Sequence, residues 1–153
     1  VAGTGWETAQ LLENNDGYAY NPSVAVDRSG NAVAVWTQRE GTTNNLWANR
    51  FVVGIGWQGP QLIENNAGNS LDPRIAVDAS GNAIAVWEQE DVGSYNLWAN
   101  RFVVGTGWQV SQLIEDAAGN SFDPSVAIES SGDAVVVWRQ WDGVAKLMAN
   151  RFY

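Results

Sequence analysis

The 153-residue sequence contains neither cysteine nor histidine, and each absence excludes a class of chemistry. Without cysteine there is no disulfide, no thiol nucleophile and no zinc–thiolate site, and the redox compartment stays open. Without histidine, the Ser-His and Cys-His nucleophilic mechanisms and the commonest transition-metal ligand are excluded too. We therefore expect no metal and no cofactor.

Basic residues are also scarce. Eight Lys and Arg stand against seventeen Asp and Glu, which gives a net charge of −9, and Lys146 is the one lysine. This charge argues against binding to nucleic acid or to an anionic membrane surface. The sequence begins at Val1, has no signal-like segment and has no apolar run near 18 residues, so we expect a soluble, processed or excised segment. A secreted or cell-surface location is favoured.

What the sequence does contain is a threefold repeat. The stretch SVAVDRSGNAVAVW at Ser23–Trp36 returns at Arg74–Trp87 and at Ser125–Trp138. Each copy predicts two short strands of Val, Ile and Ala joined by a tight Ser-Gly-Asn or Ser-Gly-Asp turn. Units of this length with their own strands and turns are typical of propeller blades. The expected fold is an all-β propeller with three four-stranded blades per chain.

The remaining strands of each unit follow from the same alignment. An outer strand is expected at 3–13, with copies at 54–64 and 105–115. A polar loop then leads to Pro22, which cannot donate a ladder hydrogen bond and is expected to mark the start of the first inner strand. After a polar loop at 39–44, a third strand is expected at 45–53.

The units 3–53, 54–104 and 105–153 form one array over residues 1–153, and its two ends do not match. The last unit has no outer strand after it, and strand 3–13 has no blade before it. Propellers have about four to eight blades, so three are too few to close. We expect strand 3–13 to complete the last blade of another copy, in a homodimer of six blades or, less favoured, a homotrimer of nine. The alternative is a fragment of a longer chain.

The core segments PSVAVDRSGNAVAVW, PRIAVDASGNAIAVW and PSVAIESSGDAVVVW resemble the blades of bacterial β-propeller repeats, including the NHL-like group. The GTGW and GIGW segments are similar to the Gly-x-Gly-Trp of small oligomeric propeller lectins, which implies sugar sites between blades. The sequence departs from sialidase-type aspartate boxes, because Asn follows Asp-x-Ser-Gly. Copies this similar also resemble engineered or recently amplified propellers.

Tryptophans recur in two kinds of position. Those of the second strand (Trp36 and its equivalents) are expected to pack in the core. Those of the turn and the third strand either pack structurally or present flat faces to sugar rings. This second set is Trp6, Trp57, Trp108, Trp47 and Trp98. The last copy has Met148 in place of the third-strand tryptophan, so a third sugar site would be weaker.

Arginine and glutamate recur as well. The repeated positions are Arg50, Arg101 and Arg151 on the third strand, and Glu13, Glu64 and Glu115 after the outer strand. One interpretation is an inter-blade ion pair, because an arginine beside a buried face usually needs a carboxylate. The other is that Arg and Glu point into an inter-blade pocket and bind sugar hydroxyls.

Catalysis is not expected. Propeller enzymes generally break the symmetry at one site, whereas the acids here recur from copy to copy, so we predict no catalytic residue and no enzymatic activity. The Asn, Asp and Gly residues at 65–72 are explained by turn chemistry rather than by calcium. The sequence favours a non-enzymatic, self-assembling propeller that binds glycans at several equivalent sites. The alternative is a scaffold whose function is limited to self-assembly.

Overall fold

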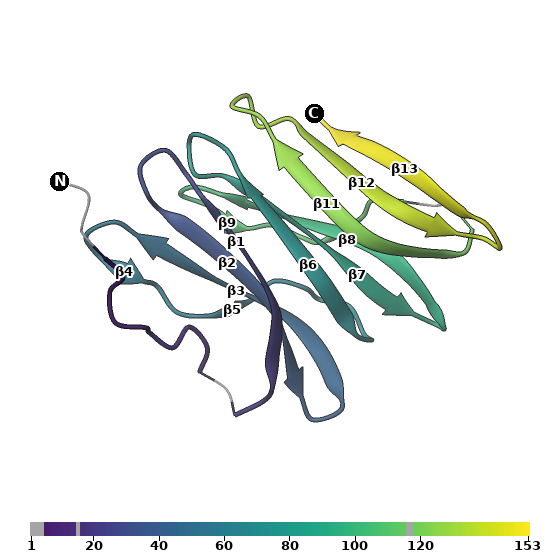
Figure 1. The fold of residues 1–153 in the computed structure, drawn as a ribbon, viewed down its shortest axis with the longest axis horizontal. Helices are drawn as coiled ribbons and strands as arrows, with labels where there is room; N and C mark the ends of the chain where they lie inside the picture. The colour runs from purple at the N-terminus through teal and green to yellow at the C-terminus, as the bar shows by residue number, and fades with distance from the viewer. Residues whose placement is uncertain (1–4, 15, 116–117) are drawn as a thin grey trace.

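The computed structural model describes residues 5–14, 16–115 and 118–153. These residues form thirteen β-strands in three antiparallel sheets and no helix, so none of them forms a helix that crosses a membrane. The three sheets lie side by side in chain order, with the C-terminus at the third (Figure 1). The prediction of an all-β fold is confirmed.

Sheet 1 follows the predicted order of strands. It contains β1 (Ala19–Val26), β2 (Ala32–Glu40), β3 (Thr43–Val52), β4 (Gly56–Trp57) and β5 (Gln61–Leu62). Strands β1, β2 and β3 pair in sequence, and both β4 and β5 pair with β3. The outer strand expected at 54–64 is thus two strands of two residues each. Between them Gly59 N donates to the side-chain Oδ1 of Asn49 at 3.0 Å, which interrupts the backbone ladder.

Sheet 2 repeats this arrangement. It contains β6 (Ser70–Val77), β7 (Ala83–Asp91), β8 (Ser94–Val103), β9 (Gly107–Trp108) and β10 (Gln112–Leu113). Strands β9 and β10 pair with β8, as β4 and β5 pair with β3. The agreement of both sheets in strand order and register shows that the repeated sequence encodes a repeated structure.

Sheet 3 stops one strand earlier. It contains β11 (Asn120–Ile128), β12 (Ala134–Trp141) and β13 (Ala145–Phe152). No described residue pairs with the outer edge of β13, and every residue of this strand is exposed. Residues 5–14, which have the sequence of an outer strand, form no strand within the chain, and positions 3–4 of the predicted strand lie outside the described residues.

Each first strand begins before its proline, which corrects the prediction that the proline opens it. Strand β1 starts at Ala19, and the register with β2 shifts between Tyr20 and Ser23, so that Pro22 lies in a β-bulge. The bulge accommodates a residue that cannot donate to the ladder. Asn21, just before Pro22, has a φ of 51°. The same bulge recurs in the other sheets, with Asp72 and Asp123 at the matching position.

The turn between the first two strands is held by the side chain of an aspartate. Asp27 Oδ1 accepts hydrogen bonds from the backbone N–H of Ser29 and Asn31, and Oδ2 accepts one from Asn31 Nδ2. Burial opposes ionisation of Asp27, but these hydrogen bonds outweigh it and lower its pKa. Sheet 2 has the same turn with Asp78 and Asn82.

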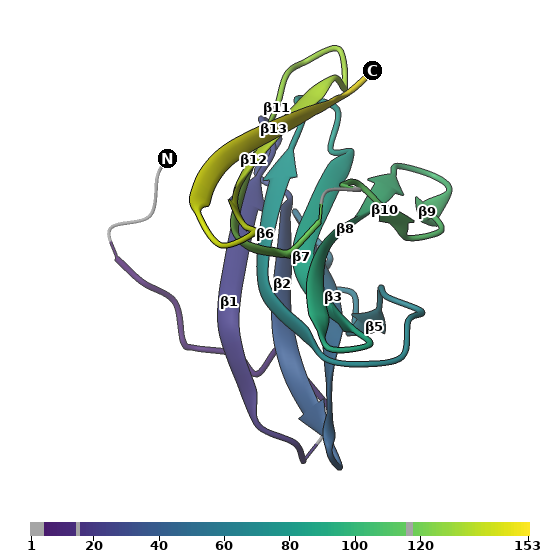
Figure 2. The same ribbon diagram turned by 90° about the vertical axis from the view of Figure 1, so that its right-hand side faces the viewer.

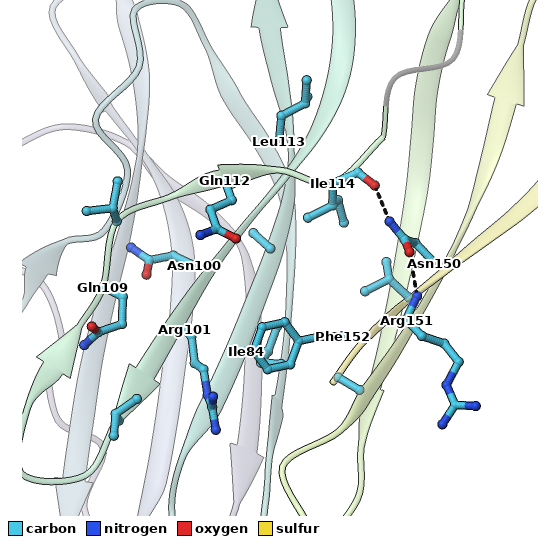
Figure 3. Close-up of a pocket in the computed structure, with 15 residues that line it drawn as sticks. Ile84, Asn100, Arg101, Gln109, Gln112, Leu113, Ile114, Asn150, Arg151 and Phe152 are labelled. Atoms are coloured by element: carbon cyan, nitrogen blue, oxygen red, sulfur yellow. Dashed lines mark hydrogen bonds between the residues drawn. The ribbon is translucent and has the colours of Figure 1, made fainter.

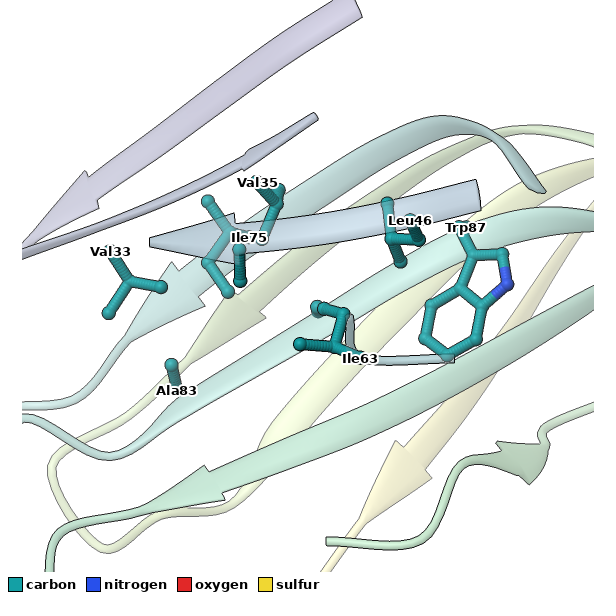
Figure 4. Packing of buried hydrophobic residues seen from close by; sticks show 9 residues of the cluster. Val33, Val35, Leu46, Ile63, Ile75, Ala83 and Trp87 are labelled. Carbon is teal, nitrogen blue, oxygen red and sulfur yellow. The ribbon is translucent and has the colours of Figure 1, made fainter. Parts of the chain in front are cut away.

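The core lies between successive sheets. Val33, Val35 and Leu46 of sheet 1 pack against Ile75 and Trp87 of sheet 2 (Figure 4). A second cluster joins β7 and β8 to β12. The second-strand tryptophans Trp36, Trp87 and Trp138 are buried, as predicted. Each donates its indole N–H to a buried glutamine two residues later, so the ring is buried without an unpaired donor. Seen edge-on, the sheets are strongly twisted (Figure 2).

Candidate functional site

A pocket of about 530 Å³, here called the large pocket, lies between sheets 2 and 3. Apolar residues of β7 and β12 form its floor. Its polar groups are Asn100 and Arg101 of β8, Gln109 and Gln112 of the outer segment, and Asn150 of β13 (Figure 3). The arrangement offers hydrogen-bond donors and acceptors around an apolar base.

Two polar atoms of this region have no partner among the described residues. Asn100 Oδ1 and Arg101 Nε are both buried and make no hydrogen bond. Buried polar groups in proteins are nearly always satisfied, so unpaired ones beside a pocket mark positions where a ligand can supply the missing partner.

The repeated arginines stack on rings instead of forming ion pairs. The guanidinium of Arg50 lies 5.4 Å from the ring centre of Phe102, and that of Arg101 lies 5.1 Å from Phe152. In each case the ring belongs to the next sheet, so this contact crosses the junction. Arg151 lies over Tyr153, two residues later in the chain, at 4.9 Å. Among residues 5–14, 16–115 and 118–153 the ion pairs are Arg139–Asp123 and Lys146–Asp142, and neither uses a repeated arginine.

Asp27 and Arg50 form no ion pair within the described residues, although the charge of Arg50 helps to lower the pKa of Asp27. A Cβ added to Gly81, in the next sheet, would lie 3.0 Å from Asp27 Oδ2 and 3.8 Å from Arg50 Nη2. The turn of sheet 2 therefore packs beside both groups. The φ of 86° at Gly81 also favours glycine at this position. The inter-blade ion pair considered from the sequence is not formed within the described residues.

A smaller cavity of about 170 Å³, the small pocket, lies at the matching place between sheets 1 and 2. Asn49, Arg50, Gln58 and Gln61 line it from sheet 1, in the positions that Asn100, Arg101, Gln109 and Gln112 occupy in the large pocket. Sheet 2 contributes Phe102 and Trp108, whose rings meet edge to face at 5.6 Å. Of the predicted turn tryptophans, Trp108 thus reaches a pocket and partly closes it.

The other predicted tryptophans lie outside both pockets. Trp57 packs edge to face on Phe51, and Trp6 is fully exposed. Trp47 and Trp98 stand directly across from core tryptophans on the neighbouring strand, and the indole N–H of each is buried with no partner in the described structure. Met148, their equivalent, is exposed.

The structure separates the repeated glutamates from the arginines. Glu13, Glu64 and Glu115 line neither pocket. Glu13 Oε2 accepts a hydrogen bond from Gln38 Nε2 at 3.5 Å, and Glu64 is buried and accepts from Asn66 N. Burial raises the pKa of Glu64, and the hydrogen bond from Asn66 offsets this only in part. The polar groups of both pockets are therefore an arginine and side-chain amides, whereas an arginine and a glutamate were considered from the sequence.

The sequence analysis missed a row of polar residues that crosses all three sheets at the bulges. Asn21 Nδ2 donates to Asp72 Oδ1 at 2.6 Å, which joins sheet 1 to sheet 2. Asp123 N donates to Glu88 Oε1 at 2.7 Å, which joins sheet 3 to sheet 2, and Arg139 pairs with Asp123 at 2.8 Å. The repeated Asn-Pro or Asp-Pro pair was the signal that could have located this row.

Glu88 is the unusual member of the row. The pKa of Glu88 is raised to about 7, chiefly by burial and in addition by the charges of Asp72 and Asp123, against the opposing effects of the hydrogen bond from Asp123 N and the charge of Arg139. The register places Thr37 and Arg139 at the same position in the other sheets. The acids are therefore not all repeated, which removes the argument from symmetry against catalysis.

No protein-family model matches the chain, and no curated protein sequence matches it. Solved structures do match its fold. A protein of unknown function from Dyadobacter fermentans aligns at a TM-score of 0.59 and 15% identity over 92% of this chain and 52% of that one. An endo-arabinase from Bacteroides thetaiotaomicron aligns at 0.59 and 15% over 94% and 59%. A mannose phosphorylase from Leishmania mexicana aligns at 0.51 and 16% over 96% and 47%.

These matches show an all-β, propeller-like fold, and the chain spans about half the length of the structures it matches. A glycosyl hydrolase from Bacteroides ovatus is a further neighbour, at a TM-score of 0.57. They contradict the prediction that the protein is not an enzyme, because this fold is one that glycoside hydrolases and phosphorylases use. They do not show the NHL-like blade suggested by the sequence.

Proposed function

We propose that the three sheets are blades of a carbohydrate-binding propeller and that sugars bind in the pockets between them. The observation that supports this proposal best is the unpaired, buried Arg101 Nε and Asn100 Oδ1 beside the large pocket. Arg101 Nε offers a hydrogen-bond donor and Asn100 Oδ1 offers an acceptor. Sugar hydroxyls both donate and accept, so a bound sugar can offer each of these two groups the partner that it lacks.

The rest of the pocket has the same chemistry. Gln109 and Gln112 add amides that both donate and accept, and the Phe152 ring offers an apolar surface. Pyranose rings present hydroxyls at their edges and C–H groups on their faces, and this lining is complementary to both. The carbohydrate-active enzymes among the structural neighbours are in keeping with a sugar as the ligand.

Glycan-array screening followed by calorimetry with the strongest glycan tests the proposal. Arg101→Ala removes a charged donor, whose hydrogen bonds contribute about 1.5–3 kcal/mol, so affinity is expected to fall roughly 10- to 100-fold. Arg139→Ala is the matched control, because Arg139 is half-exposed and lines neither pocket. A glycan bound equally by both variants and the parent would rule out this site.

Glycoside cleavage at Glu88 is a second candidate function. Its supporting observation is a buried carboxyl with a pKa of about 7 close to Asp72 and Asp123. Glycoside hydrolases pair a protonated carboxylic acid, which donates a proton to the leaving oxygen, with an ionised carboxylate. Hydrolysis of aryl glycosides and of arabinan or mannan oligosaccharides should disappear in Glu88→Gln and persist in Glu90→Gln. No turnover by the parent, or equal turnover by both variants, would eliminate this candidate.

A further inference from the structure

The third sheet exposes the residues that its two predecessors bury. Leu46 and Leu97 are 0% exposed, whereas Leu147, at the same position of sheet 3, is 88% exposed. Val35 and Val86 are fully buried, and their equivalent Val137 is 44% exposed. In sheets 1 and 2 these side chains are covered by the following sheet. Sheet 3 therefore has the apolar face of an internal sheet with nothing over it in the described chain.

The first sheet also has an uncovered apolar face, on its opposite side. Ile75 of β6 is 8% exposed because it packs on sheet 1, whereas Val24, its equivalent in β1, is 63% exposed. The exposed face of sheet 1 is thus equivalent to the face by which sheet 2 packs on sheet 1. The two uncovered faces lie at opposite ends of the array (Figure 1). They are equivalent to the two sides of the junctions that the chain already forms between sheets 1 and 2 and between sheets 2 and 3.

Residues 5–14 already lie beside sheet 1 in the manner of an outer strand. Asn100 Nδ2 donates to the carbonyl of Ile63 at 2.7 Å, and Asn150 Nδ2 to that of Ile114 at 2.7 Å. Asn49 Nδ2 makes the same bond to Leu12 O, at 2.9 Å. This bond ties each sheet to the outer segment of the sheet before it. At residues 5–14 that preceding sheet is missing.

We infer that a second copy of this chain docks head to tail, with its residues 5–14 along the outer edge of β13. The known register sets the pairing. Because Ile63 N donates to Leu46 O and Ile114 N to Leu97 O, Leu12 N of one copy donates to Leu147 O of the next. Leu62 lies opposite Trp47 and Leu113 opposite Trp98, so Leu11 lies opposite Met148.

The docked segment also completes the large pocket. Trp108 partly closes the small pocket, and the register places Trp6 of the second copy at the matching position of the large one. There it would meet Phe152 edge to face, as Trp108 meets Phe102 and Trp57 meets Phe51. The small pocket, which has such a ring, measures about 170 Å³ and the large one about 530 Å³, and a tryptophan supplied by another copy would reduce the large one. The docking does not depend on a sugar being the ligand.

Mass measurement by light scattering tests the docking. The 153-residue chain is expected at two or three times 16.6 kDa. Leu147→Lys changes a side chain that is exposed in the single chain, so its fold should be kept while the mass falls to one chain. Val144→Lys, on the exposed turn before β13, is the control and should keep the parent mass. A parent that stays at 16.6 kDa at all concentrations would overturn the inference.

A cross-link tests the register and counts the copies. Because the chain has no cysteine, Leu11→Cys with Met148→Cys introduces the sole pair of thiols. The two positions are expected to form a non-hydrogen-bonded pair, whose roughly 4.5 Å Cα separation suits a disulfide. Under non-reducing denaturing conditions, a band of two chains supports six blades, and one of three chains supports nine.

Other outcomes of the cross-link count against the proposal. A ladder of unlimited length would support the head-to-tail contact and overturn ring closure. Leu11→Cys with Ala149→Cys is the control, because position 149 is one residue out of register, faces the other side of β13 and changes little in size. Equal cross-linking in both double variants, or none in either, would overturn the pairing.

Discussion

The junction between sheets 1 and 2 and the free face of sheet 3 are built from the same sequence, yet one is a finished core and the other lies open to solvent. In the finished junction Leu46 meets Ile75 and Trp87 within one buried cluster. On the free face Leu147 meets no sheet. The comparison shows that burial in this protein depends on a neighbour and not on the sheet itself, as in other repeat proteins.

Leucine truncation should give the largest contrast between the two regions. Leu97→Ala removes a fully buried side chain and is expected to lower the free energy of unfolding by about 2–5 kcal/mol. Leu147→Ala should change it by under about 0.5 kcal/mol in dilute solution, where the chain is alone. Urea unfolding followed by tryptophan fluorescence measures both. Equal losses at low concentration would mean that sheet 3 buries this face by itself.

The charge of Glu88 should produce the next largest effect. Its pKa in the folded protein is about 7, above the usual 4.5, so the folded state binds more protons than the unfolded state between these values. Stability contributed by neutral Glu88 is therefore complete below about pH 4.5 and lost as pH rises through 7, by up to about 3 kcal/mol. Glu88→Gln should remove this loss, measured as melting temperature from pH 4 to 8. Glu90→Gln is the control, and a retained pH slope in Glu88→Gln would refute the assignment.

Substitutions in the turn between the first two strands of a sheet should change the free energy of unfolding by the smallest amount. Asn82 Nδ2 donates to Asp78 Oδ2 at 2.8 Å, whereas the third turn has Glu129 and Asp133 in these places. Asn82→Asp sets two carboxylates together and should cost about 1 kcal/mol at pH 7, and less at pH 3. The reverse double change, Glu129→Asp with Asp133→Asn, should stabilise sheet 3 by a similar amount. Chemical denaturation at both pH values checks this, and no pH dependence would contradict the charge explanation.

Features that depend on the repeat alone were predictable from the sequence. The alignment located the second-strand tryptophans and the order of the strands, because periodic apolar residues specify which faces are buried. It also predicted the unmatched ends, and their pairing between copies stays a prediction. Because each feature occurs in three copies of the repeat, the sequence itself distinguishes it from chance.

Features that depend on the contact between sheets were not predictable. The prediction that the proline starts a strand is wrong, because a single sequence does not show the bulge that lets Pro22 lie inside β1. The sequence offered two interpretations of Arg101, an ion pair with a carboxylate or a contact with sugar hydroxyls, and neither predicted that its guanidinium lies over Phe152 of the next sheet. Glu88 has no equivalent acid, since Thr37 and Arg139 stand at its position in the other sheets, so the repeat carries no signal for it.

The side-chain amides of Asn49, Asn100 and Asn150 each reach back 36 or 37 residues along the chain. They join sheets 2 and 3 to the outer segment of the sheet before, and sheet 1 to residues 5–14. Loss of structure is therefore expected to pass from sheet to sheet, beginning at the least stable end. That end is β13, whose backbone amide hydrogens should exchange with deuterium before those of β8, and those of β7, between two neighbours, should exchange last.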